Sequence, residues 1–190
     1  MALEIAPISG DFSSFGDAIA TYDIIYIGMT KLTRDPLARF SDRAEGYAKY
    51  RPHYSHDVVL ALQGACGLAS QHLIADVGCG PGMLAEIFLE NGNRVVGVEP
   101  NREMRIAGEK YLAGYPNFTA IGGSAENTTL ADTSVDFVIA GQAFHWFRPP
   151  EARIEFARIL KPGGWVVLVW RDVRIQNLCS TFDLTYSTGQ

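Results

Sequence analysis

The feature that most constrains this chain is a glycine-rich turn, Asp76-Val77-Gly78-Cys79-Gly80-Pro81-Gly82. An apolar run, Leu73-Ile74-Ala75, leads into the turn, and a helical pattern that stops at Asn91-Gly92 follows it. A strand, a tight turn and a helix form half of a βαβ unit. Glycines in such a turn let the backbone approach a ligand where a Cβ atom would collide. The pattern therefore predicts a nucleotide-like ligand above this turn.

The acid at the start of the turn narrows the choice of nucleotide. A dinucleotide would place its pyrophosphate close to Asp76, where two negative charges would repel each other. The glycine spacing also fits a dinucleotide fingerprint poorly. Counted from Gly78, the fingerprint needs a glycine where Met83 stands, and a looser match from Gly80 begins two residues late after the strand. Asp76 instead favours a ligand that carries an ammonium or sulfonium group.

Two further segments complete the expected ligand site. The β-branched run Arg94–Val98 ends in Glu99-Pro100, where a carboxylate can accept hydrogen bonds from both hydroxyls of a ribose. The strand-like segment Phe118–Ile121 is followed by Gly122-Gly123-Ser124-Ala125-Glu126. Small residues there let a purine edge reach backbone N–H groups, and Glu126 could accept from an exocyclic amine.

Five segments occur in order along the chain: Asp76-x-Gly78-x-Gly80-x-Gly82, Val98-Glu99-Pro100, Gly123-Ser124-Ala125-Glu126, Val135-Asp136-Phe137-Val138 and Leu160-Lys161-Pro162-Gly163-Gly164. In this order and spacing they resemble the motifs of the class I S-adenosylmethionine-dependent methyltransferases. The resemblance runs from about residue 40 to residue 171. It implies S-adenosylmethionine as the cofactor and methyl transfer as the activity.

Two more segments resemble one branch of that family. Phe40–Pro52 and Gln142–Phe147 are similar to the small-molecule branch, type 11, which includes trans-aconitate-type methyltransferases. This branch implies a small-molecule acceptor. Methyl transfer from a sulfonium depends largely on positioning, and no His, Cys or Asp spacing in the chain predicts a metal site.

Strands and helices alternate along most of the chain, which predicts an α/β fold with a doubly wound, mostly parallel sheet and helices on both faces. The family resemblance implies a Rossmann-like strand order of 3-2-1-4-5. Expected strands are 73–77, 94–98, 118–121, 135–140 and 164–170, and expected helices are 42–50, 55–66 with Ser55 as its cap, 82–91, 101–112 and 149–160.

The chain is expected to form one methyltransferase domain over residues 38–175, with two less regular ends. Residues 1–37 are expected to be a weakly structured extension with one strand-like patch, Ile24–Ile27, and 176–190 an irregular tail. In the family a helix and two strands follow the fifth strand, which residues 174–190 do not predict. The chain is therefore expected to be C-terminally truncated, with 164–170 as an exposed sheet edge. Either the 24–27 patch or a second copy of the chain, in a homo-oligomer, is expected to cover it.

Composition limits the partners and the compartment. A net charge of −5, a pI near 5.3 and the lack of a Lys/Arg cluster disfavour a nucleic-acid surface. No apolar run in the sequence approaches the roughly 18 residues that span a bilayer, so no membrane partner is expected. Three cysteines, an odd number, fit reduced thiols better than a disulfide framework and favour the cytoplasm.

His145 is the best candidate for a catalytic base. It follows the expected strand 135–140, at the sheet edge where open α/β sheets bind ligands. Its neighbours Phe144, Trp146 and Phe147 could keep water away from the methyl group. The competing interpretation is a packing histidine with a satisfied ring nitrogen. The backbone carbonyl of Gln142 is expected to accept a hydrogen bond from the ammonium group of the cofactor.

A lid of tyrosines and one arginine is expected over the cofactor. Arg51 could bind the methionine carboxylate with a bidentate fork, and the ring of one of Tyr47, Tyr50 and Tyr54 could receive the sulfonium. The competing interpretation is a helix-to-loop junction with surface aromatics. The residues expected to bind the cofactor are Asp76, Gly78, Gly80, Gly82, Glu99, Pro100, Ala125, Glu126, Gln142, Tyr47 and Arg51.

Two other functions stay open at this stage. A truncated, non-catalytic module could keep the S-adenosylmethionine cleft without a complete acceptor pocket. An NAD(P)-dependent oxidoreductase is less favoured, because Asp76 would lie near the pyrophosphate and the sequence has no catalytic Tyr/Lys spacing. The sequence does not identify the methyl acceptor.

Overall fold

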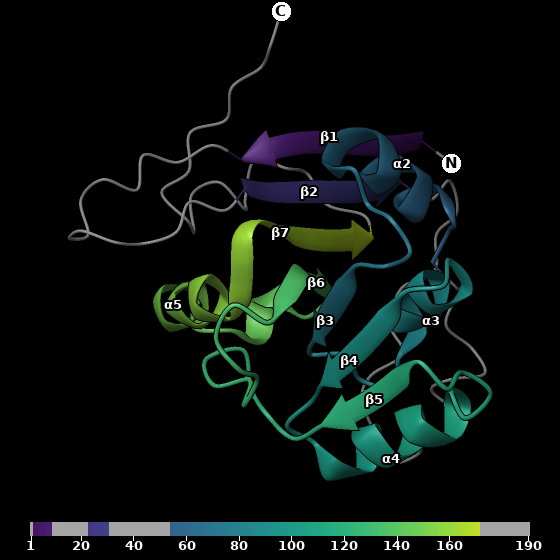
Figure 1. Ribbon diagram of the computed structural model, residues 1–190, viewed down its shortest axis with the longest axis vertical. Coiled ribbons are helices and arrows are strands. Elements are labelled where there is room, and N and C mark those ends of the chain that lie inside the picture. Colours follow the sequence, from purple (N-terminus) through teal and green to yellow (C-terminus); the bar gives the residue numbers. More distant parts are fainter. Residues whose placement is uncertain (1, 9–22, 31–53, 172–190) are drawn as a thin grey trace, which may run out of the picture.

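The computed structural model describes residues 2–8, 23–30 and 54–171. These residues form one seven-stranded sheet with helices packed against it (Figure 1). The strands are β1 Ala2–Ile8, β2 Asp23–Thr30, β3 Leu73–Val77, β4 Arg94–Val98, β5 Phe118–Ile121, β6 Val135–Gly141 and β7 Leu160–Arg171. The helices are α2 Asp57–Cys66, α3 Met83–Glu90, α4 Arg102–Tyr111 and α5 Pro149–Ile159, with a short 3-10 helix, η1, at Phe144–Trp146.

The order of strands in the sheet is β1-β2-β7-β6-β3-β4-β5. Its last five members are parallel neighbours, so the predicted order 3-2-1-4-5 is confirmed. The chain leaves β3 toward β4 on one side, and β6 pairs with β3 on the other side. Open α/β sheets bind ligands at such a reversal of strand order, at the carboxyl ends of the strands.

Helices cover both faces of the sheet, as predicted, because neighbouring residues of each strand point to opposite sides. On one face, Ile74 and Phe137 pack with the buried residues of α2 and α3. On the other face, Ala75 and Val138 pack with Ala152 and further residues of α5. The strands around β3 are therefore buried on both sides, which explains their continuous apolar runs.

The start of α2 differs by one or two residues from the prediction. Ser55 was expected to cap this helix, but the capping position is His56 and the helix begins at Asp57. The Ser55 hydroxyl instead accepts a hydrogen bond from the Asp57 N–H at 3.2 Å. The Ser55 side chain, one residue before the capping position, therefore still accepts a hydrogen bond from the first turn of the helix.

The last parallel strand is longer than the predicted 164–170. Leu160 already pairs with Val135, and Trp165 pairs with Phe137, so the segment between them carries extra residues and a shift in register. Gly163, at φ +76°, takes the left-handed conformation that this irregularity needs. The residues just before the predicted strand are thus an irregular part of β7 itself.

The far side of β7 is covered by a strand from the start of the chain. β2 runs parallel to β7, with Ile25 opposite Val167, and β1 pairs antiparallel with β2 as the outer strand (Figure 1). The expectation that the 24–27 patch covers this edge is confirmed, and the edge is not exposed in this structure. The sequence did not predict β1. The expected helix 42–50, Tyr47, Arg51 and the tail 176–190 lie outside the described residues.

Within the described ranges, no helix is long and apolar enough to cross a membrane.

Candidate functional site

A cavity of about 680 Å³ lies at the carboxyl ends of β3, β4, β5 and β6. Ligand sites of small molecules typically measure about 300–1,000 Å³. The cavity is at the reversal of strand order, where the fold predicts a ligand. The predicted site residues that line it are Asp76, Gly78, Gly80, Glu99, Pro100, Ala125, Glu126, Gln142 and His145.

The three glycines of the turn have different roles. All have positive φ angles: +70° for Gly78, +53° for Gly80 and +86° for Gly82. A Cβ atom on Gly78 would lie 2.6 Å from the Cβ of Ala143, so this glycine lets two cavity-lining loops touch. Around Gly80 the space for a Cβ atom is open.

Gly82 does not line the cavity, contrary to its prediction as a ligand contact. It occupies the N-terminal capping position of α3. A Cβ atom there would lie 2.5 Å from Cδ1 of Leu112. Gly82 is therefore needed for packing and for starting the helix.

Asp76 is buried, with 1% of its surface exposed, and it lines the cavity. Among the described residues neither of its carboxylate oxygens has a hydrogen-bond partner. Burial raises the pKa of Asp76 to about 7, and the negative charge of Glu99 adds to this rise. The nearby Ala85 N–H lowers the pKa of Asp76, although it does not form a hydrogen bond of normal geometry with the carboxylate. Buried polar groups in proteins are nearly always paired. An unpaired carboxylate facing a cavity therefore indicates a ligand that brings a cation or hydrogen-bond donors.

Glu99 is held in place by the backbone. Its Oε2 accepts from the N–H of Gly80 at 2.9 Å, and its Oε1 accepts from the N–H of Asn101 at 3.0 Å. Arg105 fixes the same strand end by donating to the carbonyl oxygens of Glu99 and Pro100 at 2.7 and 3.0 Å. Each carboxylate oxygen can accept further bonds, so Glu99 presents an oriented pair of acceptors.

Glu126 already has a partner within the chain. Burial opposes its ionisation, but the Arg148 N–H, which donates to Oε1 at 2.8 Å, helps to hold its pKa below the ordinary value. Arg148 is the capping position of α5 and has no capping side chain of its own. One oxygen of Glu126 thus binds the start of α5, and Ser124 also contributes to the lowered pKa of this carboxyl.

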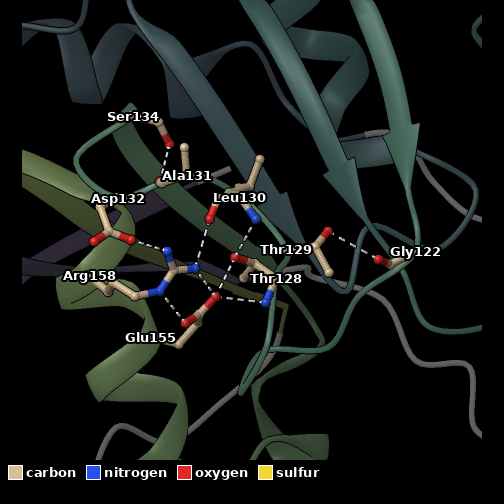
Figure 2. A network of polar contacts seen from close by, with 9 residues as sticks. All are labelled: Gly122, Thr128, Thr129, Leu130, Ala131, Asp132, Ser134, Glu155 and Arg158. Atoms are coloured by element: carbon tan, nitrogen blue, oxygen red, sulfur yellow. Dashed lines mark hydrogen bonds and ion pairs between the residues drawn. The ribbon is translucent and has the colours of Figure 1, made fainter.

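A polar network anchors the loop that carries Ser124–Glu126 to α5 (Figure 2). Oε1 of Glu155 accepts from the N–H of Thr128 at 2.8 Å and from its hydroxyl at 2.6 Å. Arg158 donates to both oxygens of Glu155 and to the carbonyl of Leu130, and it pairs with Asp132. These contacts hold one wall of the cavity against the helix.

The loop after β6 is strained at Gln142. This residue has φ +56°, in the left-handed region, and its N–H donates to the carbonyl of Val169 at 3.0 Å. Its side-chain nitrogen Nε2 is buried without a partner among the described residues. Such strain is common at functional sites. Gln142 therefore brings an unused hydrogen-bond donor to the cavity.

His145 lies in η1, within a group of aromatic rings. Its ring centroid is 4.8 Å from that of Trp146 and 5.4 Å from that of Trp170. In the described part of the chain, its ring nitrogens make no hydrogen bond to another residue. Partial burial lowers the pKa of His145. The neutral ring can therefore accept a proton.

Several lining residues were not predicted. Met83 and Leu84 begin α3, and Met104 lies in the first turn of α4. Apolar residues at these positions look like core residues in a sequence, so no local signal identifies them. Tyr54, considered as part of the lid, is buried and lines the cavity.

The charge of the cavity is negative. Asp76, Glu99 and Glu126 line it, and no Lys or Arg from residues 54–171 does. A pyrophosphate would therefore meet three carboxylates and no cation from this part of the chain. A nucleoside with a positive charge fits these residues.

Comparison with known proteins identifies similar chains. Residues 75–168 match the family described as "Methyltransferase domain". The chain is 37% identical over 149 residues to an uncharacterized methyltransferase of Mycobacterium tuberculosis; the match covers 77% of this chain and 58% of the relative. The chain thus spans little more than half the length of that relative.

Two solved structures are also similar. The YcgJ protein of Bacillus subtilis matches with a TM-score of 0.54 and 26% identity, over 60% of this chain and 50% of that one. A putative S-adenosylmethionine-dependent methyltransferase of Methanococcus maripaludis matches with a TM-score of 0.59 and 17% identity, over 71% and 68%. At 17% identity, the second likeness shows the fold alone.

Proposed function

The chain belongs to the class I S-adenosylmethionine-dependent methyltransferases, and from this premise we propose that it transfers a methyl group from S-adenosylmethionine to a small-molecule acceptor. The observation that carries the proposal is the buried, unpaired carboxylate of Asp76, in a cavity that it shares with Glu99. A cofactor with two positive groups and a ribose would satisfy both carboxylates.

The described residues suggest which part of the cofactor each would hold. Asp76 and the carbonyl of Gln142 would bind the ammonium end, and Glu99 would accept from the ribose hydroxyls. Ala125 and Glu126, on the anchored loop, would line the adenine. The glycines Gly78 and Gly80, with Pro100, leave room for the nucleoside between the two strand ends.

His145 would act as the base. When bound, S-adenosylmethionine supplies an electrophilic methyl group whose leaving group is a neutral thioether. A hydroxyl acceptor must also lose a proton, and an unprotonated ring nitrogen of His145 can take it. The exposed His145 side chain then returns the proton to water. Correct placing of the acceptor supplies much of the remaining rate.

Two alternatives have different support. A non-catalytic S-adenosylmethionine-binding module is the second candidate, because the unpaired carboxylate of Asp76 in the cavity argues for cofactor binding and not by itself for turnover. The oxidoreductase is weaker, because the cavity lacks a cation for a pyrophosphate among the described residues.

The acidic net charge supports a small-molecule partner over nucleic acid, and three cysteines support the cytoplasm.

Calorimetry with S-adenosylhomocysteine and with NAD tests the proposed function. We expect the chain to bind S-adenosylhomocysteine and not NAD. In Glu99→Gln, a single carbonyl oxygen must accept from two backbone N–H groups and from the ribose. A hydrogen bond to a charged group contributes about 1.5–3 kcal/mol, so we expect the affinity for S-adenosylhomocysteine to be roughly 10-fold to 100-fold weaker. Glu109→Gln, an exposed acid on α4, is the matched control and should bind like the wild type.

Preferential binding of NAD would overturn the assignment. A methyl-transfer assay over small carboxylic acids, phenols and amines then separates the enzyme from the binding module. Cofactor binding with no turnover of any acceptor would favour the module.

A further inference from the structure

We propose that the methyl acceptor is a neutral phenol that stacks on Trp146 and gives its hydroxyl proton to His145. This inference rests on the proposed function and names its substrate class. It concerns the part of the cavity formed by His145, Trp146 and Phe147 of the loop after β6, called here the aromatic rim. Trp170, on β7, contacts the ring of His145 but does not line the cavity.

The aromatic rim includes an exposed ring on which a planar ligand can stack. Trp146 lines the cavity, yet 71% of its surface is exposed to solvent. A large aromatic side chain gains free energy when its face is covered, and aromatic pairs add about 0.5–1.5 kcal/mol to that. Exposed aromatic groups at the mouth of a cavity therefore favour a planar, apolar ligand.

The charges of the described lining residues disfavour an acidic acceptor. The described lining residues include three carboxylates, Asp76, Glu99 and Glu126, and neither Lys nor Arg. An acceptor carboxylate would be repelled and would find no ion pair among these residues. An acceptor that is neutral when it binds avoids that repulsion.

The polar groups of the same loop match a hydroxyl. Gln142 Nε2 is a buried donor without a partner in the described chain, and the unprotonated nitrogen of His145 is an acceptor. A hydroxyl is the small group that both accepts and donates a hydrogen bond. Both residues line the cavity and lie three positions apart on one loop.

The acidity of the acceptor favours a phenol over an aliphatic alcohol. A phenolic hydroxyl ionises with a pKa of about 10, which is within reach of an imidazole base while the methyl bond forms. The proton moves to a ring nitrogen of His145, and the oxygen keeps the electron pair. With that pair the oxygen bonds to the methyl carbon, while the former bonding pair leaves with the sulfur of the thioether. The imidazolium then loses its proton to water.

Binding of 4-methylphenol, measured by calorimetry on chain saturated with S-adenosylhomocysteine, tests the inference. Tricarballylate and ethanolamine serve as the acidic and basic comparison compounds. We expect 4-methylphenol to bind most tightly and Trp146→Ala to weaken its binding about 10-fold. Ile154→Ala is the matched control, since Ile154 is 68% exposed and does not line the cavity.

His145→Phe separates binding from proton transfer, because it keeps an aromatic ring and removes the nitrogens. We expect this variant to bind 4-methylphenol within about twofold of wild type. Its turnover with S-adenosylmethionine should fall about 100-fold, the lower end of what a general base contributes. A role of His145 in packing alone would leave turnover unchanged.

Two results would overturn the inference. One is tighter binding of tricarballylate or ethanolamine than of 4-methylphenol, and the other is unchanged 4-methylphenol affinity in Trp146→Ala. If S-adenosylhomocysteine binds normally in these variants, only the substrate class is wrong. If it does not bind even to the wild type, the proposed function fails first.

Discussion

A carboxylate that is 1% exposed and has no hydrogen-bond partner among the described residues raises the free energy of the folded chain. Asp76 is such a residue. Because it lies in the cavity, a bound ligand would offset this cost in free energy. The ligand would supply the charge that the fold leaves out. The charge of Asp76 therefore lowers the stability of the ligand-free chain and favours the binding of a cationic ligand.

Removing the charge of Asp76 should stabilise the ligand-free chain at neutral pH. The pKa of Asp76 is raised from 3.8 to about 7, so the folded state holds the proton more strongly than the unfolded state. The stability gained from protonation is present below about pH 4 and is lost as the pH rises through about 7. We expect Asp76→Asn to raise the melting temperature at pH 8 by about 2–4 °C, as for about 1 kcal/mol in a domain of this size.

Thermal melts from pH 4 to pH 8, with and without S-adenosylhomocysteine, check this prediction. The variant should lose most of the ligand-induced rise in melting temperature, and its melting temperature should vary less with pH than that of the wild type. Glu109→Gln is the control for loss of an exposed charge. A variant that is less stable than wild type at pH 8 would contradict the prediction.

At the scale of elements, the loop between β5 and β6 depends on α5 for its position. Glu155, on α5, binds Thr128 of the loop through two hydrogen bonds, and Arg158 binds the loop carbonyl of Leu130 (Figure 2). The same loop brings Ala125 and Glu126 to the cavity. Helix α5 thus holds this loop in position at the cavity, although none of the described residues of α5 lines the cavity.

Neutralising Glu155 should weaken this link. Arg158 and the two Thr128 bonds lower the pKa of Glu155 from 4.5 to about 2, despite burial. The stability from its ionised form is present above about pH 4.5 and is lost as the pH falls toward 2. We expect Glu155→Gln to lower the free energy of unfolding at pH 7 by about 2 kcal/mol, since bonds to charged groups contribute about 1.5–3 kcal/mol.

Urea unfolding at pH 7 and at pH 3 measures this effect, and the difference between variant and wild type should shrink at pH 3. Glu151→Gln is a control on the same helix, because Glu151 forms only an exposed ion pair with Arg148 at 3.6 Å. Equal losses of stability in both variants would argue against a specific role for Glu155.

For the whole molecule, the sheet is completed by a segment far away in the sequence. β2 pairs with β7 on one side and with β1 on the other. β7 therefore has neighbours along both edges, and its apolar run is not left as an open edge. An association between copies through the edge of β7 would require β2 to be displaced.

A proline in β2 should expose that edge. Ile25 lies in the middle of β2, which has partners on both sides, so Ile25→Pro removes a ladder hydrogen bond whichever side its N–H faces. We expect this variant to form dimers or larger species, and Ile25→Val to behave like the wild type. Size-exclusion chromatography with light scattering distinguishes the two, and a monomeric proline variant of unchanged stability would contradict the expected role of β2.

Local patterns were sufficient to predict the five parallel strands from β3 to β7, but not their order in the sheet. The strand-like runs at 73–77, 94–98 and 118–121 coincide with β3, β4 and β5. The signal is strongest for β3, where Ile74 to Val77 are all buried, because strands covered on both faces need mostly apolar residues. The resemblance to a family with known strand order supplied the rest. β1 could not be predicted this way, because its pairing with β2 depends on a partner that its own residues do not specify.

The sequence by itself determined the glycine turn, the two strand-end carboxylates and the position of His145, since these follow from local spacing. Only the tertiary structure decided what each one contacts. Leu112 makes Gly82 a packing residue, Arg148 occupies one oxygen of Glu126, and nothing in the described chain pairs with Asp76. Backbone conformation depends on neighbours in the chain, whereas burial and hydrogen bonding depend on groups brought together by folding.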